Sequence, residues 1–338
     1  MPDLETAIAS LESSLATPIG SSFNIDNQPD VIAQLLADKR SPNTRRAYMN
    51  DITDFFRVVA SSEPNRDLVL EFLHLEQPKA VQLLLSYKAK LIEKGLKEAT
   101  INRRLAAIKS LTAMGRKIGV CNYTLEDVRG EKLRAYRDTS GVDKETYARV
   151  LEATDRLKEA AFSSRSQLKG IRDYALLRLL WGNALRRGEI SATNIDDFDV
   201  ESKTLAILGK GKGTQKESVK LPSSTVDAIS DWLAARGTAN SNAPLFIAID
   251  NANYGRRLSG NGIYTIVDRL FKKAGISKKM SPHRIRHSSI TAVLDATDGN
   301  IRKAQQLSRH ANINTVMTYD DNRTNHQGEM SQLLDDLI

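Results

Sequence analysis

Three short stretches near the end of the chain decide its fold and chemistry: SPHRIRH (281–287), LSRH (307–310) and NTVMTY (314–319). The Ser-Pro pair predicts a helix start, which places His283 and Arg286 three residues apart on one helical face. Together with His310 and Tyr319 they fall within 37 residues, without an acidic cluster or a cysteine. This combination suits phosphoryl transfer to a protein nucleophile without a metal, because Mg²⁺ sites need Asp or Glu ligands.

The chemistry assigns a candidate role to each of these side chains. The Tyr319 phenol has an ordinary pKa of about 10 and needs a base or strong positive charge before it can attack. His283 is the candidate for taking its proton, and His310 for donating to a phosphate oxygen. The ordinary alternatives are a structural role for each histidine and an amphipathic anchor role for Tyr319.

Arginine is the best metal-free ligand for a phosphate that gains negative charge. Candidates are Arg286 and, in WGNALRRGEIS (181–191), Arg186. Glu189 follows Arg186 by one helical turn and is expected to orient its guanidinium. The alternative is that Arg186 and its neighbour are surface arginines at a helix end.

A glycine-rich turn, ILGKGKGTQKE (207–217), lies between two predicted strands, Thr204–Leu208 and Glu217–Leu221. Its lysines could protonate the leaving oxygen or reach a DNA groove, and the alternative is a flexible or phosphate-cradling turn. The turn does not match a P-loop. A zinc site at His283 and His287 is disfavoured, because Arg-Ile-Arg lies between them and no glutamate base is present.

Charge and composition point to a polyanionic partner. The net charge is +8, yet residues 1–38 hold six acids and no Lys or Arg, so the rest carries 49 basic against 35 acidic residues. Nucleic acid is favoured over membrane. One cysteine, no signal-peptide pattern and no long apolar run predict a cytoplasmic protein.

The pattern along the chain predicts several parts. Residues 1–34 form an acidic tail with a short amphipathic helix, and residues 35–128 an all-helical domain. The charged segment 129–145 is the predicted linker. Residues 146–338 complete the chain, beginning with a helical segment at 146–187.

In this order, the motifs resemble the tyrosine recombinase, or phage-type integrase, family. The pattern Gly-Leu-Arg-x-x-Glu is here Ala184-Leu185-Arg186-Arg187-Gly188-Glu189, and the common Leu-Gly-His is here Leu-Ser-Arg-His. SPHRIRH matches closely, and the spacing from His310 to Tyr319 fits. The hairpin resembles Gly-Lys-Gly-x-Lys-Glu with about two extra residues, so the general acid is either Lys210 or Lys212. Lys210 is favoured because it directly follows Leu208-Gly209.

The resemblance implies a site-specific DNA recombinase of mainly α, α+β class. An all-helical core-binding domain would precede a helical catalytic domain with a small antiparallel β-sheet. Tyr319 would form a 3′-phosphotyrosyl link, with no cofactor, metal or ATP. The partners would be two double-stranded DNA sites and a homotetramer formed through a C-terminal helix at 327–338. Alternatives are a type IB-like topoisomerase, which the helical N-terminal domain disfavours, and a catalytically idle DNA-binding protein.

Two Arg-Arg pairs in the N-terminal domain are the candidates for contacting the DNA major groove. They lie on predicted helices and are Arg45, Arg46, Arg103 and Arg104.

Overall fold

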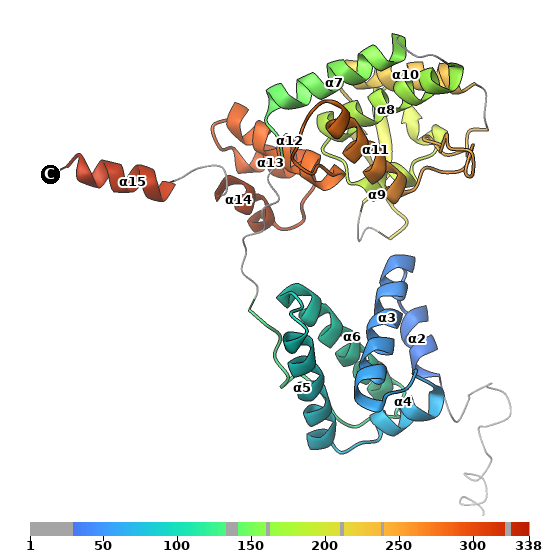
Figure 1. Ribbon diagram of the computed structural model, residues 1–338, viewed down its shortest axis with the longest axis vertical. Coiled ribbons are helices and arrows are strands. Elements are labelled where there is room, and N and C mark those ends of the chain that lie inside the picture. The colour runs from blue at the N-terminus through green and yellow to red at the C-terminus, as the bar shows by residue number, and fades with distance from the viewer. Residues whose placement is uncertain are drawn as a thin grey trace, which may run out of the picture. The chain divides into compact units, whose positions relative to one another are not determined.

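The chain divides into two compact units, Met1–Arg134 and Ala135–Ile338. Figure 1 shows the computed structural model, which describes residues 30–132, 141–159, 163–209, 213–237, 240–321 and 326–337. The division falls inside the segment 129–145. Residues 133–140 of that segment and the amphipathic helix expected before residue 30 lie outside the described residues, so the linker and the tail remain predictions.

The described part of the N-terminal unit is helical, as predicted. Its helices are α2 (Val31–Ala37), α3 (Pro42–Ala60), α4 (Arg66–Leu73), α5 (Gln77–Glu93) and α6 (Glu98–Lys117). Ser41 caps α3 by accepting the backbone N–H of Thr44, and Pro42 occupies the first turn. The sequence therefore sets the start of α3 by a local capping signal.

An aromatic cluster forms the centre of this unit. The rings of Phe55, Phe56, Phe72 and Tyr87 are buried, and three edge-to-face ring pairs around Phe55 have centroids 5.2 Å apart. Each fully buried aromatic ring contributes about 1.5–3 kcal/mol through removal from water. The apolar faces of α3 and α6 pack into this core, which leaves their polar faces outward.

The C-terminal unit is mainly helical with one small sheet. Its helices are α7 (Lys144–Glu159), α8 (Ser164–Gly182), α9 (Arg187–Ala192), the 3₁₀ turn η1 (Ile195–Asp197), α10 (Ser223–Arg236), α11 (Gly260–Lys273), α12 (Pro282–Ala296), α13 (Ile301–Ser308), α14 (Ile313–Asp321) and α15 (His326–Asp335). The antiparallel sheet has the order β1 (Phe198–Asp199), β2 (Thr204–Leu208) and β3 (Lys216–Lys220). The predicted fold class, mainly helical with a small antiparallel sheet, is confirmed.

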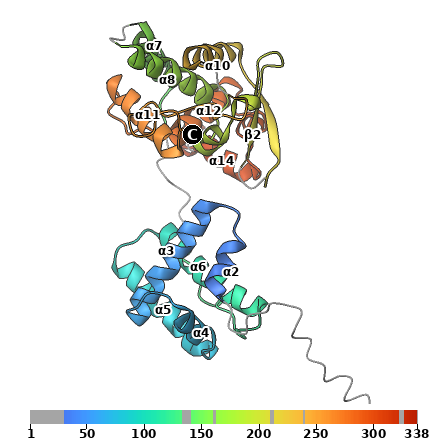
Figure 2. The same ribbon diagram turned by 90° about the vertical axis from the view of Figure 1, so that its right-hand side faces the viewer.

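Helix α8 organises this unit. It packs against α7, α10 and α12, and Figures 1 and 2 both show α7, α8 and α10 side by side. The rings of Tyr147 and Trp181 stack with centroids 4.2 Å apart, which fixes α7 on α8. The end of α8 therefore holds the following turn, residues 183–186, in a fixed place.

The segment predicted as helical, 146–187, holds two long helices, α7 and α8, and the first residue of α9. Helix α7 ends at Glu159, and α8 begins after Ser163, whose hydroxyl caps it by accepting the N–H of Ser166 at 3.2 Å. A capping serine competes with helix continuation, which the apolar periodicity alone did not reveal. Within the described residues, no helix has the length and apolar character needed to cross a membrane.

Candidate active site

Helix α12 carries the central arginine. Ser281 caps the helix, and its Oγ accepts the N–H of Arg284 at 3.3 Å. Arg286, one turn further, is only 1% exposed. Its guanidinium donates to the carbonyls of Ala184 and Ser308, and it lies 3.2 Å from Nε2 of His310. One side chain thus ties the turn after α8 to the end of α13.

Burial lowers the pKa of Arg286 to about 10, with the charge of Arg186 acting in the same direction and that of Glu189 opposing it. The guanidinium remains charged at neutral pH. A charge kept in a buried site interacts strongly with any anion that enters, because water does not screen it.

The turn between α8 and α9 presents Arg186. Ala184, where the family pattern has glycine, adopts a left-handed conformation with φ of +45° and is fully buried. Arg186 then caps α9. Its backbone N–H donates to Glu189 Oε2 at 2.8 Å, and its guanidinium donates to Oε1 at 2.7 Å. Glu189 is buried while Arg186 is partly exposed, so the carboxylate holds a guanidinium that solvent can still reach.

His310 follows α13 and is neutral at pH 7. Burial and, after it, the nearby charges of Arg286, Arg186, His283 and Arg309 together lower its pKa to about 4. Its Nδ1 lies 2.9 Å from the hydroxyl of Ser308, and its Nε2 faces the Arg286 guanidinium, which can only donate. These two contacts are satisfied together when Nδ1 carries the proton.

Tyr319, on α14, is 7% exposed. Its ring centroid lies 4.4 Å from that of His287 and 5.8 Å from that of His310. Burial raises the pKa of its phenol, while the charges of Arg286 and Arg186 oppose that rise. The phenol and the two arginines are therefore close enough to influence one another's ionisation.

The structure brings together Arg186, Arg286, His310 and Tyr319, four of the candidate catalytic residues, from four separate segments. His283 is exposed at the start of α12, and its charge reaches His310. Lys210 and Lys212 lie outside the described residues. The strands that flank them, β2 and β3, are described and pair Leu208 with Lys216.

Two side chains at this site were not singled out by the sequence reasoning. His287 packs on the Tyr319 ring. Arg309 contacts Glu189 and Glu217. A signal for Arg309 was visible in the departure from Leu-Gly-His, whereas the spacing of His283 and His287 did not show which of them faces Tyr319.

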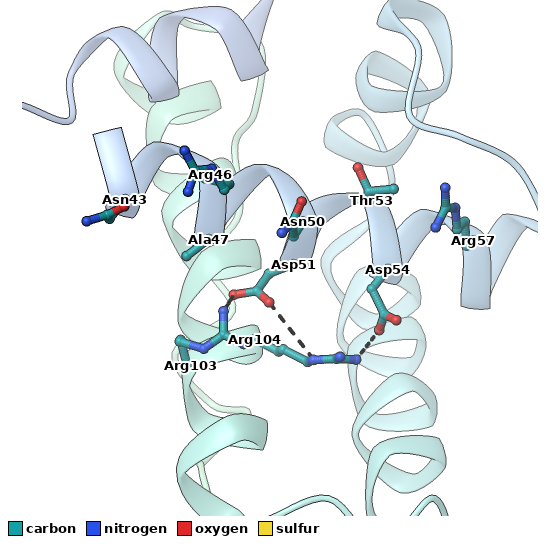
Figure 3. Close-up of a pocket in the computed structure, with 10 residues that line it drawn as sticks. All are labelled: Asn43, Arg46, Ala47, Asn50, Asp51, Thr53, Asp54, Arg57, Arg103 and Arg104. Atoms are coloured by element: carbon teal, nitrogen blue, oxygen red, sulfur yellow. Dashed lines mark hydrogen bonds and ion pairs between the residues drawn. The ribbon is translucent and has the colours of Figure 1, made fainter. Parts of the chain in front are cut away.

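The candidate DNA-binding residues lie in the N-terminal unit. A hollow of about 570 Å³ lies between α3 and α6. The residues that line it are drawn in Figure 3 and are Asn43, Arg46, Ala47, Asn50, Asp51, Thr53, Asp54, Arg57, Arg103 and Arg104. Of the four predicted arginines, Arg45 is not among these residues and donates through Nε to the carbonyl of Lys39.

The other predicted arginines differ in their ion pairs and in how far their side chains are exposed to solvent. Arg103 and Arg104 form ion pairs with the buried Asp51 and with Asp54 (Figure 3). The side chain of Arg104 is 20% exposed and that of Arg103 is 47% exposed. Arg46 is exposed on α3. The Arg104 guanidinium is thus turned into the domain, while Arg46 and Arg103 are more accessible.

No group of three His, Cys, Asp or Glu side chains gathers as around a metal ion within the part of the chain that the structure describes.

Comparison with known proteins identifies the family. Residues 142–326 match the phage integrase family, and residues 32–117 match its N-terminal SAM-like domain. The chain belongs to the phage integrase family. It is 48% identical to a tyrosine recombinase of Synechocystis over 91% of this chain and 96% of that one, and 44% identical to one of Synechococcus elongatus over 98% and 99%. The chain is a tyrosine-type site-specific DNA recombinase, as the motifs predicted.

Solved structures share the fold. XerH recombinase bound to a palindromic difH substrate is 20% identical, with a TM-score of 0.63 over 86% of this chain and 80% of that one. The Tn1549 transposon integrase in complex with transposon right-end DNA is 16% identical, with a TM-score of 0.57 over 90% and 99%. At these identities the likeness concerns the fold.

Proposed function

We propose that Tyr319 is the nucleophile of this recombinase. Its phenol oxygen would attack a DNA phosphorus, the bond from phosphorus to the 5′ oxygen would break, and a 3′-phosphotyrosyl link would form. The observation that carries this proposal is the meeting of the Tyr319 ring with His310 beside the charges of Arg186 and Arg286. A phosphate placed there would gain charge close to two guanidiniums.

The remaining roles follow from the chemistry of each group. Arg186 and Arg286 would hold the non-bridging oxygens. His310 would donate to a phosphate oxygen from Nε2 after Nε2 leaves Arg286 and gains a proton, and Nδ1 could then accept from the Ser308 hydroxyl. His283, which is exposed, would accept the phenol proton. Lys210, or Lys212 in the other register, would protonate the 5′ oxygen as it leaves.

The second half of the reaction reverses the first. A 5′ hydroxyl from the partner duplex would attack the phosphotyrosyl link, displace Tyr319 and pass its proton back to the site. One phosphodiester is broken and one is formed, so the bond energy is conserved in the covalent intermediate. Neither ATP nor a metal ion is needed for this balance.

Tyr319→Phe tests the assignment. Incubation with a DNA site nicked near the cleavage position should trap a covalent adduct with the parent protein and none with the variant. The matched control is Tyr254→Phe, an exposed tyrosine of the same unit, which should still form the adduct. An adduct formed by Tyr319→Phe would contradict the proposal.

The polar row on α3 is the proposed base-reading surface. Asn43, Arg46, Asn50, Thr53 and Arg57 line the hollow and recur at helical spacing. Arginine and asparagine form bidentate bonds to guanine and adenine in the major groove. The buried Asp51 would hold Arg103 beside that row.

Half-site binding measurements test this surface. Arg46→Ala should weaken binding by about 1–3 kcal/mol and reduce its salt dependence. Lys79→Ala, which removes an exposed charge on α5, is the control. Equal binding by both variants would refute the surface.

Assembly is proposed to use α15. Its exposed apolar side chains are Met330, Leu333 and Leu334, which share one helical face, and the exposed Leu337 follows in the turn after the helix. The predicted occupant of that face is a second copy of the chain within a homotetramer on paired DNA sites. Truncation after residue 325 should reduce synaptic assembly and recombination but leave half-site binding. Unchanged tetramer formation would show that α15 packs on its own subunit. The proposed compartment is the cytoplasm.

A further inference from the structure

The backbone at Arg309 is in an unusual conformation. Arg309 ends α13 with φ of +55°, in the left-handed region. The common family pattern has glycine immediately before the histidine, and glycine enters this region without a steric cost. For any other L-residue the left-handed conformation costs about 1–2 kcal/mol. The contacts of the Arg309 side chain must therefore offset this backbone cost.

The side chain of Arg309 is directed into the protein. It is 14% exposed, and it donates to Glu189 Oε2 at 3.2 Å and to the carbonyls of Leu307 and Asn183 at 2.9 and 3.3 Å. Its Nε lies 3.4 Å from Glu217 Oε1, an ion-pair contact without hydrogen-bond geometry. Burial lowers its pKa, and the charge of Glu189 opposes this change. These contacts direct its donors to protein groups and not to a phosphate.

Glu189 and Glu217, the two carboxylates that Arg309 contacts, belong to different parts of the site. Glu189 holds Arg186, the partly exposed arginine that is proposed to bind the phosphate. Glu217 lies on β3, where it pairs across the sheet with Ile207 at the base of the lysine turn. Arg309 therefore joins the anchor of Arg186 to the strand through which the lysine turn returns.

We propose that Arg309 is a positioning residue that holds the base of the lysine hairpin in register with the phosphate site. The proposal rests on the proposed function of Tyr319 and the hairpin lysine. Its ion pair with Glu217 limits where β3 lies relative to Arg186 and His310. A fixed position of β3 would reduce the entropy that must be lost before the general acid can meet the leaving oxygen.

The ion pair between Arg309 and Glu217 is partly shielded from solvent. Its two side chains are 14% and 31% exposed, so solvent screens it less than a surface pair. If it only stabilised the fold, its loss would slow every step of cleavage alike. If it positions the general acid, its loss would slow only reactions in which the leaving group needs a proton.

Two substrates separate these outcomes. One carries the natural 5′ oxygen at the cleavage position and the other carries sulfur there, and a thiolate leaves without needing protonation. The variants are Glu217→Gln, which keeps the shape but removes the charge, and Arg309→Lys, which keeps the charge but cannot bridge both carboxylates. Glu201→Gln, an exposed change in the turn between β1 and β2, is the control.

The expected result is a change in the ratio of the two cleavage rates. Glu217→Gln and Arg309→Lys should cleave the oxygen substrate at least about tenfold more slowly than the parent, and the sulfur substrate within about threefold of it. Glu201→Gln should match the parent on both. Tyr319→Phe should be inactive on both substrates, and activity there would contradict the nucleophile assignment separately.

Equal slowing on both substrates, or no slowing on either, would overturn the proposal. Unfolding midpoints from tryptophan fluorescence accompany the rates, because both tryptophans, Trp181 and Trp232, lie in the C-terminal unit. A lowered midpoint with an unchanged rate ratio would assign Arg309 to stability alone and would also overturn it.

Discussion

Replacing Glu189 by glutamine should destabilise the C-terminal unit and disable the site. The Glu189 side chain is 2% exposed and accepts three hydrogen bonds, two from Arg186 and one from Arg309. A glutamine amide keeps one acceptor oxygen but places an NH₂ group where the second oxygen stood. In either orientation of the amide, a donor then faces a donor.

The magnitude follows from these contacts. A lost hydrogen bond to a charged group costs about 1.5–3 kcal/mol, and removing one partner of a buried ion pair costs about 3–5 kcal/mol. Arg186 is partly exposed, so water compensates for part of the loss. We expect the free energy of unfolding to fall by about 3 kcal/mol, with DNA cleavage slowed at least about 100-fold as Arg186 loses its orientation.

Urea titration followed by tryptophan fluorescence measures the first effect, because both tryptophans report on this unit alone. A loss of that size lowers the urea midpoint by roughly 1–2 M. The matched control is Glu152→Gln, which breaks an ion pair to Arg156 on the exposed face of α7 and should cost less than about 0.5 kcal/mol. Equal midpoints for the two variants would refute the reasoning that burial makes Glu189 important.

Three further outcomes are expected. DNA cleavage should persist in EDTA, because Arg186 and Arg286 supply the positive charge, and activity restored by added Mg²⁺ after chelation would contradict this. The pKa of His310 is lowered to about 4, so the unfolded state binds its proton first. The contribution of His310 to stability is therefore complete above pH 6.5 and is lost as pH falls toward 4, on the order of 1–2 kcal/mol after solvent screening. His310→Gln should remove that part of the slope in urea midpoints between pH 6.5 and 5, and an unchanged slope would count against it. Ala184→Gly should stay within about 1 kcal/mol of the parent, because relief of left-handed strain offsets the loss of a buried methyl, whereas Ala184→Val should cost more than about 3 kcal/mol by urea titration. Equal midpoints for the two Ala184 variants would show that its φ is not constrained.

Local signals explain what the sequence could predict. Ser41-Pro42 and Ser281-Pro282 fix two helix starts, because the caps depend on residues three apart. The contact of Arg186 with Glu189 likewise depends on one helical turn. Features of this kind involve neighbours in the chain, so residue spacing is enough to predict them.

The features that could not be predicted from the sequence depend on contacts between residues far apart in the chain. The contacts of Arg286 with the Ala184 carbonyl and of Arg309 with Glu189 join residues more than a hundred positions apart. His283 and His287 are one turn apart on α12, and only the packing of α14 decides that His287 meets Tyr319. The break after α7 and the two-residue strand β1 are too short or too weakly patterned to stand out from the sequence.

The burial of Tyr319 has a consequence for unwanted DNA cleavage. Burial raises the pKa of the Tyr319 phenol above its ordinary value, so the protonated form predominates at pH 7. The proposed nucleophile is therefore held in its less reactive, protonated form in the free protein. In the proposed mechanism, cleavage requires a base to take this proton once DNA is bound, so a buried and protonated phenol would limit accidental nicking.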